Sequence, residues 1–410
     1  MTENAVARPE AFRHYLDHAS TTPMRPGAVS EFVRQTEQEA NPSSLHTTGR
    51  SSRRAVEEAR ESIAHALDVR PSEVIFTSGG TESNNLAIRG IHAQRQAVDP
   101  ARTVIVSSQI EHHAVLDVAR ALRDSGQAEL VLIDVTRDGV IDTDQLATVL
   151  AEQGDSISLV TMMWANNETG VVQPIAAISE LCERAGVPLH TDAAQAVAWM
   201  TKPASQLTGP YALSVSAHKF GGPVGIGALV RHDLELVAQM HGGGQEGNLR
   251  SGTLSAPLTA SMSSALTDAV ADQAQQAQRI AALRDQLAEG IVTEFPDAIV
   301  NGAASQRVPG ILNVSIPGTE SDALLMLLDA AGIECSAGSA CNAGIPQPSH
   351  VLLAMGIDPD IARGSLRLSL GWSSTQEDVQ AALAALPEAV ERVRRATASR
   401  RRRPEVGVTV

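Results

Sequence analysis

The stretch SVSAHKFGGP, residues 214–223, decides the fold, because it carries a lysine from an apolar strand into a glycine-rich turn. The lysine is Lys219, and the chain holds only one other, Lys202, so arginine supplies nearly all the remaining positive charge. Arginine stays protonated, whereas lysine becomes an amine nucleophile once burial or a nearby charge lowers its pKa from about 10.4. Most lysines are ordinary surface residues. A second observation is therefore needed before Lys219 can be interpreted as a nucleophile.

That observation is an aspartate at the end of the preceding apolar stretch. Residues 187–190 read as a strand, which leads into Asp192, 27 positions before Lys219. A lysine at one strand end and a carboxylate at the next are what pyridoxal phosphate requires. The lysine forms the Schiff base, and the carboxylate keeps the pyridine nitrogen protonated so that the ring accepts electrons. The pair predicts a pyridoxal phosphate site.

Length and composition set the protein class. The 410 residues are enough for two domains, and 43% hydrophobic with 19% charged residues is typical of a soluble globular protein. A formal charge of −15 argues against nucleic acid as the main ligand. No apolar run is long enough to cross a bilayer, so no membrane partner is expected. Three cysteines are too few for a disulfide scaffold, and the N-terminus does not resemble a signal peptide, which indicates a cytoplasmic location.

The first two-thirds of the chain alternates apolar runs with helical patterns. This order predicts a mainly parallel sheet covered on both faces, with ligands at the carboxyl ends of its strands. The expected strands are 73–77, 103–106, 130–133, 157–163, 187–190 and 212–216, and the expected helices are 51–67, 114–123, 142–152 and 175–184. One long helical stretch, 261–295, leads into a smaller C-terminal domain. There we expect strands 311–316, 333–335 and 365–370 and helices 322–330 and 376–394.

Three polar clusters follow expected strands. The run TSGGTESNN, residues 77–85, opens a helix whose free N–H groups and positive end suit a phosphate, although many Gly-Gly turns only reverse the chain. His112, in the run EHHAVL, has a flat ring that could cover an aromatic cofactor and move a proton; a capping histidine is the alternative. No third ligand lies at helical spacing, so no metal is expected. Asn167 could donate to a substrate carboxylate or to a cofactor oxygen, or simply form a turn.

The last two candidate site residues are a cysteine, Cys341, and an arginine, Arg367. Cys341 lies in SAGSACNAG, residues 336–344, a run of small residues that packs poorly. Most lone cysteines are inert, but an exposed loop suits a thiol that must reach two places. Cys182 and Cys335 lie in apolar patterns and are expected in the core. Arg367 on a late strand could bind a carboxylate through two hydrogen bonds.

With these motifs, the chain resembles the cysteine desulfurases that feed iron–sulfur cluster assembly, which are pyridoxal phosphate enzymes of fold type I in the class V aminotransferase group. The matching stretches are YLDHASTTP (15–23), NPSSLH (41–46), TESNN (81–85), HK (218–219), RSGT (250–253) and GSAC (338–341). The resemblance implies an α/β, PLP-dependent transferase fold type I. Its large domain, 29–265, would hold a mainly parallel mixed sheet covered by helices. A smaller α+β domain would comprise 1–28 and 266–398, with 399–410 a disordered basic tail.

The resemblance also implies a role for each matching residue. Lys219 would carry the cofactor, Asp192 would pair with the pyridine nitrogen, Gln195 would bond the phenolic oxygen, and His112 would stack on the ring. The phosphate would be held by Gly80, Thr81, Ser216, His218 and, from the second subunit of a homodimer, Thr253. Asn167 and Arg367 would bind the carboxylate of L-cysteine. Cys341 would attack the substrate sulfur, with His112 as proton acceptor, leaving alanine and a persulfide for a cluster scaffold, a tRNA-thiolating enzyme or a molybdenum-cofactor enzyme.

Two departures and two alternatives remain open. Gly247 stands where relatives usually have an arginine, which would weaken contacts with acidic partners, and Ala217 replaces a common glycine without expected harm. A pyridoxal phosphate aminotransferase or lyase on the same fold would not need Cys341. A non-catalytic scaffold for cluster assembly would have no use for Lys219 and Asp192. Cys335 could serve as a resolving thiol, although a packed residue is the preferred interpretation.

Overall fold

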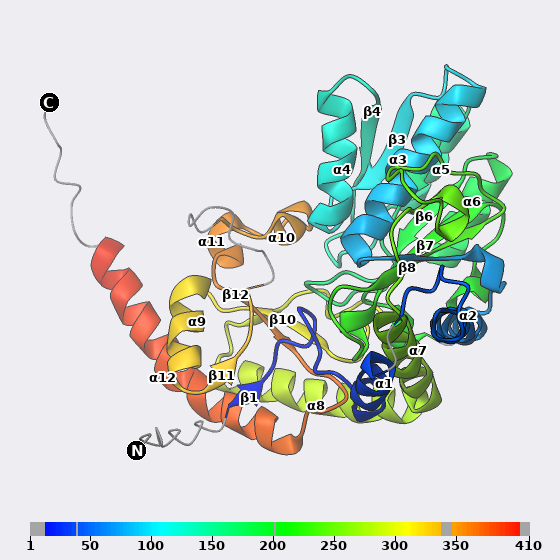
Figure 1. Cartoon of the computed structure of the whole chain (residues 1–410). Coiled ribbons are helices and arrows are strands. Elements are labelled where there is room, and N and C mark those ends of the chain that lie inside the picture. The colour runs from blue at the N-terminus through cyan, green and yellow to red at the C-terminus, as the bar shows by residue number, and fades with distance from the viewer. Residues whose placement is uncertain (1–12, 38–39, 201, 338–346, 402–410) are drawn as a thin grey trace, which may run out of the picture.

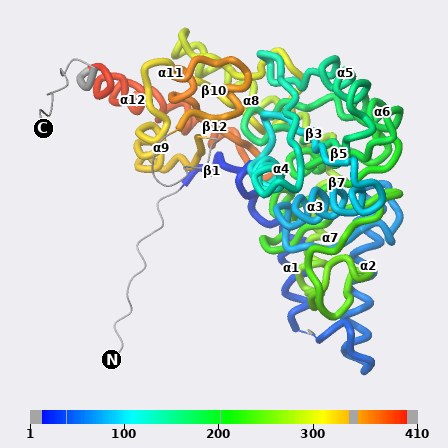
Figure 2. The backbone as a smooth tube through the Cα atoms, turned by 90° about the horizontal axis from the view of Figure 1, so that it is seen from above, coloured from blue at the N-terminus to red at the C-terminus, as the bar shows by residue number. Residues whose placement is uncertain are grey.

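The computed structural model describes residues 13–37, 40–200, 202–337 and 347–401. Two lobes make up the molecule, a larger one built on the main sheet and a smaller one that ends in the long helix α12 (Figure 1). Seen from above, the lobes lie side by side, and helices α1 and α2 project from one side of the larger lobe (Figure 2). Within the described residues, no helix is long and apolar enough to span a membrane.

The large lobe is organised by a seven-stranded sheet in the order β2-β8-β7-β6-β5-β3-β4. Its strands are β2 Val74–Thr77, β3 Val104–Ser108, β4 Glu129–Ile133, β5 Ile157–Thr161, β6 Leu189–Asp192, β7 Tyr211–Ser216 and β8 Gly227–His232. Only β8 runs antiparallel to its neighbours, β2 and β7. The predicted α/β fold with a mainly parallel sheet is therefore confirmed. The sequence did not predict β8, which begins directly after the glycine-rich turn that follows Lys219.

Alternating side chains bury both faces of this sheet. Val74 and Phe76 pack into one apolar core, while Ile75, between them, packs into a second core on the opposite face. A strand that contributes to two cores must be covered by helices on both sides. The helices of the large lobe are α1 Pro26–Thr36, α2 Thr47–Leu67, α3 Gly80–Val98, α4 His113–Asp124, α5 Thr143–Gln153, α6 Ile175–Arg184 and α7 Ala256–Ala271. Short 3-10 helices lie at Pro71–Glu73, Val197–Trp199, Pro203–Gln206, Ala217–Lys219 and Glu246–Asn248.

The small lobe has its own core, to which Leu16 near the N-terminus contributes. A three-stranded sheet joins β9 Ile299–Val300, β10 Ile311–Ser315 and β12 Ser365–Ser369, and a two-stranded sheet pairs β1 His14–Tyr15 with β11 Ile333–Glu334. Its helices are α8 Gln273–Glu294, α9 Ser321–Ala330, α10 His350–Ala354, α11 Pro359–Ala362 and α12 Gln376–Arg401. We propose the domain division 29–265 against 1–28 plus 266–398, because Leu16 packs with the C-terminal elements. Its two boundaries fall within α1 and α7. Of the expected tail 399–410, residues 399–401 continue α12, and 402–410 lie outside the described residues.

One expected element was wrong. The stretch 261–295 is not one helix, because α7 ends at Ala271 and α8 begins at Gln273. Asp272 at the break accepts a hydrogen bond from Arg25 Nη1 at 3.0 Å. That partner lies 247 residues away, so the helical pattern of the segment itself contained no sign of the break.

Candidate active site

A cavity of about 400 Å³ lies where β5, β6 and β7 end and α3 begins. Ten of the twelve predicted site residues line it: Gly80, Thr81, His112, Asn167, Asp192, Gln195, Ser216, His218, Lys219 and Arg367. Parallel strands place their carboxyl ends at one edge of a sheet, which explains why these distant residues meet. The other two are Thr253 and Cys341. Thr253 is exposed elsewhere, and Cys341 lies outside the described residues.

Lys219 follows β7 in a single 3-10 turn and directs its amine toward the N-terminal segment. Its Nζ donates to the carbonyl oxygens of Ala19 at 2.7 Å and Ser20 at 2.8 Å. Burial lowers the pKa of Lys219 to about 8, and the Arg367 cation lowers this pKa further, while Asp192 and Asp17 raise it. A partly neutral amine near neutral pH is suited to nucleophilic and acid–base chemistry.

Asp192 at the end of β6 is held by two donors. Asn84 Nδ2 donates to its Oδ2 at 2.7 Å, and the Ala194 N–H donates to its Oδ1 at 2.9 Å. Asn84 is buried on α3, one helical turn after Gly80, on the side that faces the cavity. The sequence did not single out Asn84, although it lies in the quoted 77–85 run. Its spacing of four from Gly80 was the available signal. Gln195 Nε2 donates to Ala19 O at 2.8 Å.

The turn before α3 forms a cradle for an anion. Gly79 has φ +150°, and no side chain caps α3, so the helix presents its first N–H groups toward the cavity edge. A Cβ on Gly80 would lie 3.4 Å from the Ser216 side chain. His218 shares a 2.9 Å hydrogen bond with Thr21, and burial lowers its pKa to about 4, so it is neutral. This arrangement, with Lys219 and the Asp192 carboxylate, fits the phosphate, aldehyde and ring nitrogen of pyridoxal phosphate.

His112 caps α4, and its Nδ1 accepts the Ala114 N–H at 3.1 Å. Burial lowers the pKa of His112, with opposing effects from Asp192, which raises it, and Lys219, which lowers it. The neutral ring must then carry its proton on Nε2, because Nδ1 is already an acceptor. This tautomer suits a ring that stacks or donates, and it argues against His112 as the proton acceptor that the sequence favoured.

Two fully buried carboxyl groups, which the sequence did not single out, stand next to predicted site residues. Glu111 precedes His112; its Oε1 accepts the Met163 N–H at 2.7 Å, and its Oε2 has no partner among the described residues. Burial raises the pKa of Glu111 well above its ordinary value. Glu168 follows Asn167 and accepts a hydrogen bond from Ser349, and burial raises the pKa of Glu168 as well.

Arg367 on β12 reaches the cavity from the small lobe. Its Nη1 donates to Asn167 O at 3.0 Å, and its Nη2 donates to Asp17 Oδ1 at 2.9 Å and Ser20 Oγ at 2.5 Å. Its Nε has no partner in the described part of the chain. An unpartnered guanidinium nitrogen beside the cavity is the feature expected of a carboxylate site.

The described cysteines are not reactive. Burial raises the pKa of Cys182 and of Cys335 to about 12, so neither forms a thiolate readily. Cys182 packs in the main core, as predicted, and Cys335 is partly buried against the small-lobe core. Packing is thus the role that the structure supports for Cys335.

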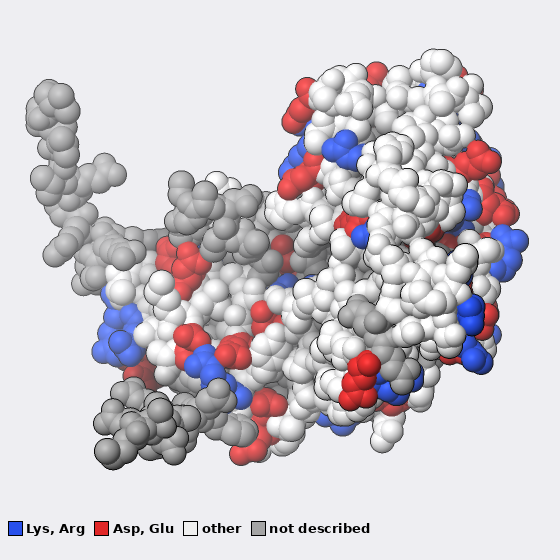
Figure 3. Space-filling model, viewed as in Figure 1, with Lys and Arg blue, Asp and Glu red and all other residues white. Residues whose placement is uncertain are grey.

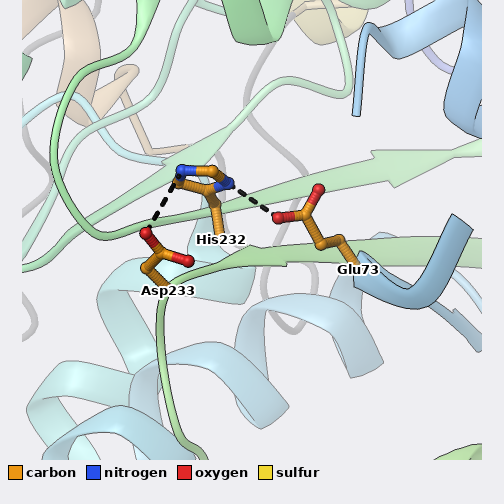
Figure 4. Close-up of side chains that lie close together, drawn as sticks. All are labelled: Glu73, His232 and Asp233. Atoms are coloured by element: carbon orange, nitrogen blue, oxygen red, sulfur yellow. Dashed lines mark hydrogen bonds and ion pairs between the residues drawn. The ribbon is translucent and has the colours of Figure 1, made fainter. Parts of the chain in front are cut away.

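One group of potential metal ligands occurs among the described residues. Glu73, His232 and Asp233 bring their ligand atoms within 4.8 Å of one another (Figure 4). The Glu73 carboxylate already accepts hydrogen bonds from His232 Nδ1 at 2.7 Å and Arg70 Nη2 at 2.6 Å. None of these residues lines the cavity. The Arg70 guanidinium bonded to Glu73 disfavours a cation, so we assign no metal there.

Acidic and basic side chains are interspersed on the visible face of the described residues, without a continuous basic surface (Figure 3). This distribution agrees with the acidic net charge and gives no sign of a nucleic-acid interface on that face.

Comparisons with known proteins agree with this geometry. Residues 14–382 match the family model described as aminotransferase class-V. An IscS-like cysteine desulfurase of Mycobacterium tuberculosis is 50% identical over 384 residues, covering 93% of this chain and 97% of the relative. A solved NifS-like protein superposes with a TM-score of 0.84 at 30% identity, covering 93% of this chain and 100% of the other. SspA, solved in complex with cysteine, has a TM-score of 0.76 at 32% identity, with 88% and 100% covered.

Proposed function

The chain belongs to the aminotransferase class-V family, among the cysteine desulfurases, and from this premise we propose a specific reaction for it. It converts L-cysteine to L-alanine and keeps the sulfur as a persulfide on Cys341. The sulfur then passes to a protein that assembles iron–sulfur clusters or thiolates tRNA. The observation that carries the proposal is one cavity that unites Lys219, Asp192 and Arg367.

The cofactor of this proposal is pyridoxal phosphate, which, when bound, delocalises the electron pair left on the substrate α-carbon after proton removal. Lys219 would hold it covalently, and Asp192, fixed by Asn84, would face its ring nitrogen. The uncapped start of α3 at Gly80 would hold its phosphate. The remaining proposed contacts are Thr81, His112, Gln195, Ser216 and His218, with Thr253 reaching the site of a second subunit.

This chain's own residues perform three tasks. The Arg367 guanidinium and the Asn167 amide bind the substrate carboxylate and fix the α-carbon. The Lys219 amine, with a pKa of about 8, is neutral in a useful fraction of molecules near neutral pH and takes the α-proton. His112, neutral and protonated on Nε2, would cover the cofactor ring and would not accept the thiol proton.

Cys341 carries out the sulfur step as a thiolate. It attacks the substrate sulfur, an S–S bond forms and the Cβ–S bond of the substrate breaks, after which protonation at Cβ yields alanine. A free thiol has a pKa of about 8.5, so an appreciable thiolate fraction needs a mildly basic solution or a nearby cation. The Lys219 ammonium and Arg367 are the cations that the cavity offers.

The test is sulfide and alanine production from L-cysteine with dithiothreitol. The parental protein should form both products in equal amounts, and Cys341→Ser should still change colour with cysteine but release no sulfide. Sulfide release by Cys341→Ser at the parental rate would instead favour an aminotransferase or lyase. Borohydride reduction followed by peptide mapping should place the cofactor on Lys219, and Lys202 is the only competing lysine.

The proposal also includes a second subunit, a cytoplasmic location and a sulfur-acceptor protein. We propose a homodimer, because Thr253 is exposed and its predicted role requires a second subunit. Light scattering should give twice the chain mass of 43.1 kDa. The proposed cytoplasmic location follows from the few cysteines, and capture of persulfidated partners would identify the sulfur acceptor.

A further inference from the structure

The N-terminal strap, which we define as residues 17–22, crosses from the small lobe to the large one beside the cavity. It follows β1, which pairs with β11 in the small lobe, and leads to α1 in the large lobe (Figure 1). Its backbone is fastened to β12, since His18 N donates to Ser369 O at 3.3 Å and Ala19 N donates to Ser369 Oγ at 2.9 Å. The strap therefore has a fixed position relative to Arg367, two residues before Ser369.

Two side chains of the strap hold the Arg367 guanidinium. Nη2 donates to Asp17 Oδ1 at 2.9 Å and to Ser20 Oγ at 2.5 Å. The Ser20 hydroxyl in turn donates to Asp17 Oδ1 at 2.9 Å, which closes a three-membered network. Arg367 is only 4% exposed, and a guanidinium this deeply buried keeps one orientation only when its hydrogen-bond partners fix it.

The same strap also holds the reactive lysine. The Lys219 amine donates to the carbonyls of Ala19 and Ser20, and Thr22 N donates to His218 O at 2.9 Å. Ser20 thus contacts the carboxylate-binding arginine through its hydroxyl and the lysine through its backbone. A change in the hydroxyl alone leaves the lysine contact in place, so the two effects are separable.

We propose that Asp17 and Ser20 are positioning residues, which hold the Arg367 guanidinium in the orientation that receives the substrate carboxylate. The inference rests on the proposed function. Positioning predicts a loss confined to ligands that carry a carboxylate, because only these use the guanidinium. A purely structural role predicts equal losses for all ligands of the cavity.

A matched ligand pair makes this distinction. L-Alanine and L-alaninamide share the amine and the methyl group, but only the first carries a carboxylate. Each is measured as a competitive inhibitor of sulfide release from L-cysteine by the holoenzyme. The inhibition constant of alaninamide divided by that of alanine then reports recognition of the carboxylate alone.

Ser20→Ala should lower this ratio about tenfold, the low end of the effect of one hydrogen bond to a charged group. Ser20→Thr, which keeps the hydroxyl, should restore most of it. Ser369→Ala is the matched control, since it removes a serine that fastens the strap without contacting Arg367, and its ratio should stay parental. Equal weakening of both ligands by Ser20→Ala would overturn the proposal.

Asp17→Asn provides a second test if Ser20→Ala does not fold. Removal of a negative charge near Arg367 would by Coulomb attraction alone strengthen alanine binding and raise the ratio. Positioning predicts the opposite, a fall of threefold or more, so an unchanged or higher ratio would overturn it. A parental enzyme that forms no sulfide from L-cysteine would contradict the proposed function instead. An active parental enzyme with unaltered ratios in the variants would contradict only the role of Asp17 and Ser20.

Discussion

The buried carboxyl of Glu111 makes a clear prediction for the pH dependence of stability. Glu111 is fully buried; its Oε1 accepts the Met163 N–H, and its Oε2 has no partner among the described residues. Burial raises the pKa of this carboxyl well above its ordinary value. The folded protein therefore keeps a proton on Glu111 at pH values where the unfolded chain, with a pKa near about 4.3, has lost it.

Proton linkage gives the sign and size of the change in the free energy of unfolding with pH. A group whose folded pKa is raised contributes stability that is fully present below the unfolded pKa and is lost as the pH rises through the folded pKa. Across that window, one extra proton bound to the folded state lowers the free energy of unfolding by about 1.4 kcal/mol per pH unit. For a chain of this length, this is about 1.5 °C in melting temperature per pH unit.

The perturbation is Glu111→Gln, which keeps an acceptor for the Met163 N–H but cannot titrate. Melting temperatures of the two proteins are compared by calorimetry between pH 5 and pH 8. The melting temperature of the parental protein should fall relative to that of the variant as the pH rises, by up to about 1.5 °C per pH unit while Glu111 keeps its proton in the folded state. Glu58→Gln, at an exposed position, should leave the pH profile unchanged. Parallel profiles for Glu111→Gln and the parental protein would refute a protonated Glu111.

Three further predictions test other parts of the site and its frame. Asn84→Ala removes one of the two hydrogen-bond donors to Asp192. Titration of the cofactor-free protein with pyridoxal phosphate, followed by absorbance, should show about tenfold weaker binding. Binding with the parental affinity would contradict this prediction. The second prediction concerns cofactor-free protein in which the chain's other lysine is replaced by arginine. The acylation rate of Lys219 should rise with pH and reach half its maximum near pH 8, because burial lowers the pKa of Lys219 to about 8. A midpoint above pH 10 would exclude this lowered pKa. Arg60 donates to the buried Glu246 carboxylate at 2.7 and 2.9 Å, and Glu246→Ala removes this partner. Urea denaturation should show that the free energy of unfolding falls by about 3–5 kcal/mol. A fall of less than about 1 kcal/mol would argue against a stabilising buried pair.

The sequence predicted those parts of the site whose signals are local. Lys219 and Asp192 each end an apolar strand, and parallel strands bring such ends together, so their meeting was predictable. The run that begins α3 carried its own signal, because a Gly-Gly turn before a helix leaves N–H groups free. Most of the ten predicted residues that line the cavity lie in or beside motifs of this kind, and Arg367, inside β12, is the exception.

The remaining features depend on partners that are far apart in the chain. Asp17 and Ser20 meet Arg367 across about 350 positions, and no periodicity of the N-terminal run indicates such a contact. Asp272, at the break between α7 and α8, likewise accepts a hydrogen bond from the distant Arg25. Glu111 looked like one more polar residue beside a histidine pair, because burial is a property of the folded chain. Local pattern predicts elements and strand ends, whereas burial and pairing set the charge of each group.

That charge distribution explains how the cavity is suited to an amino acid. Two cationic side chains, Lys219 and Arg367, face two acidic ones, Asp192 and Asp17. Burial shifts the pKa values of the neighbouring titratable groups toward neutral forms: His112, His190, His218, Glu111 and Glu168. In the proposed reaction, a substrate carboxylate bound at Arg367 would add a negative charge near the Lys219 amine. Opposite charge favours the protonated amine, so the pKa of Lys219 would rise when this carboxylate binds. In the proposed reaction each neutral Lys219 amine would then be a stronger base, while the neutral fraction near neutral pH would fall, and a ligand without a carboxylate would produce neither change.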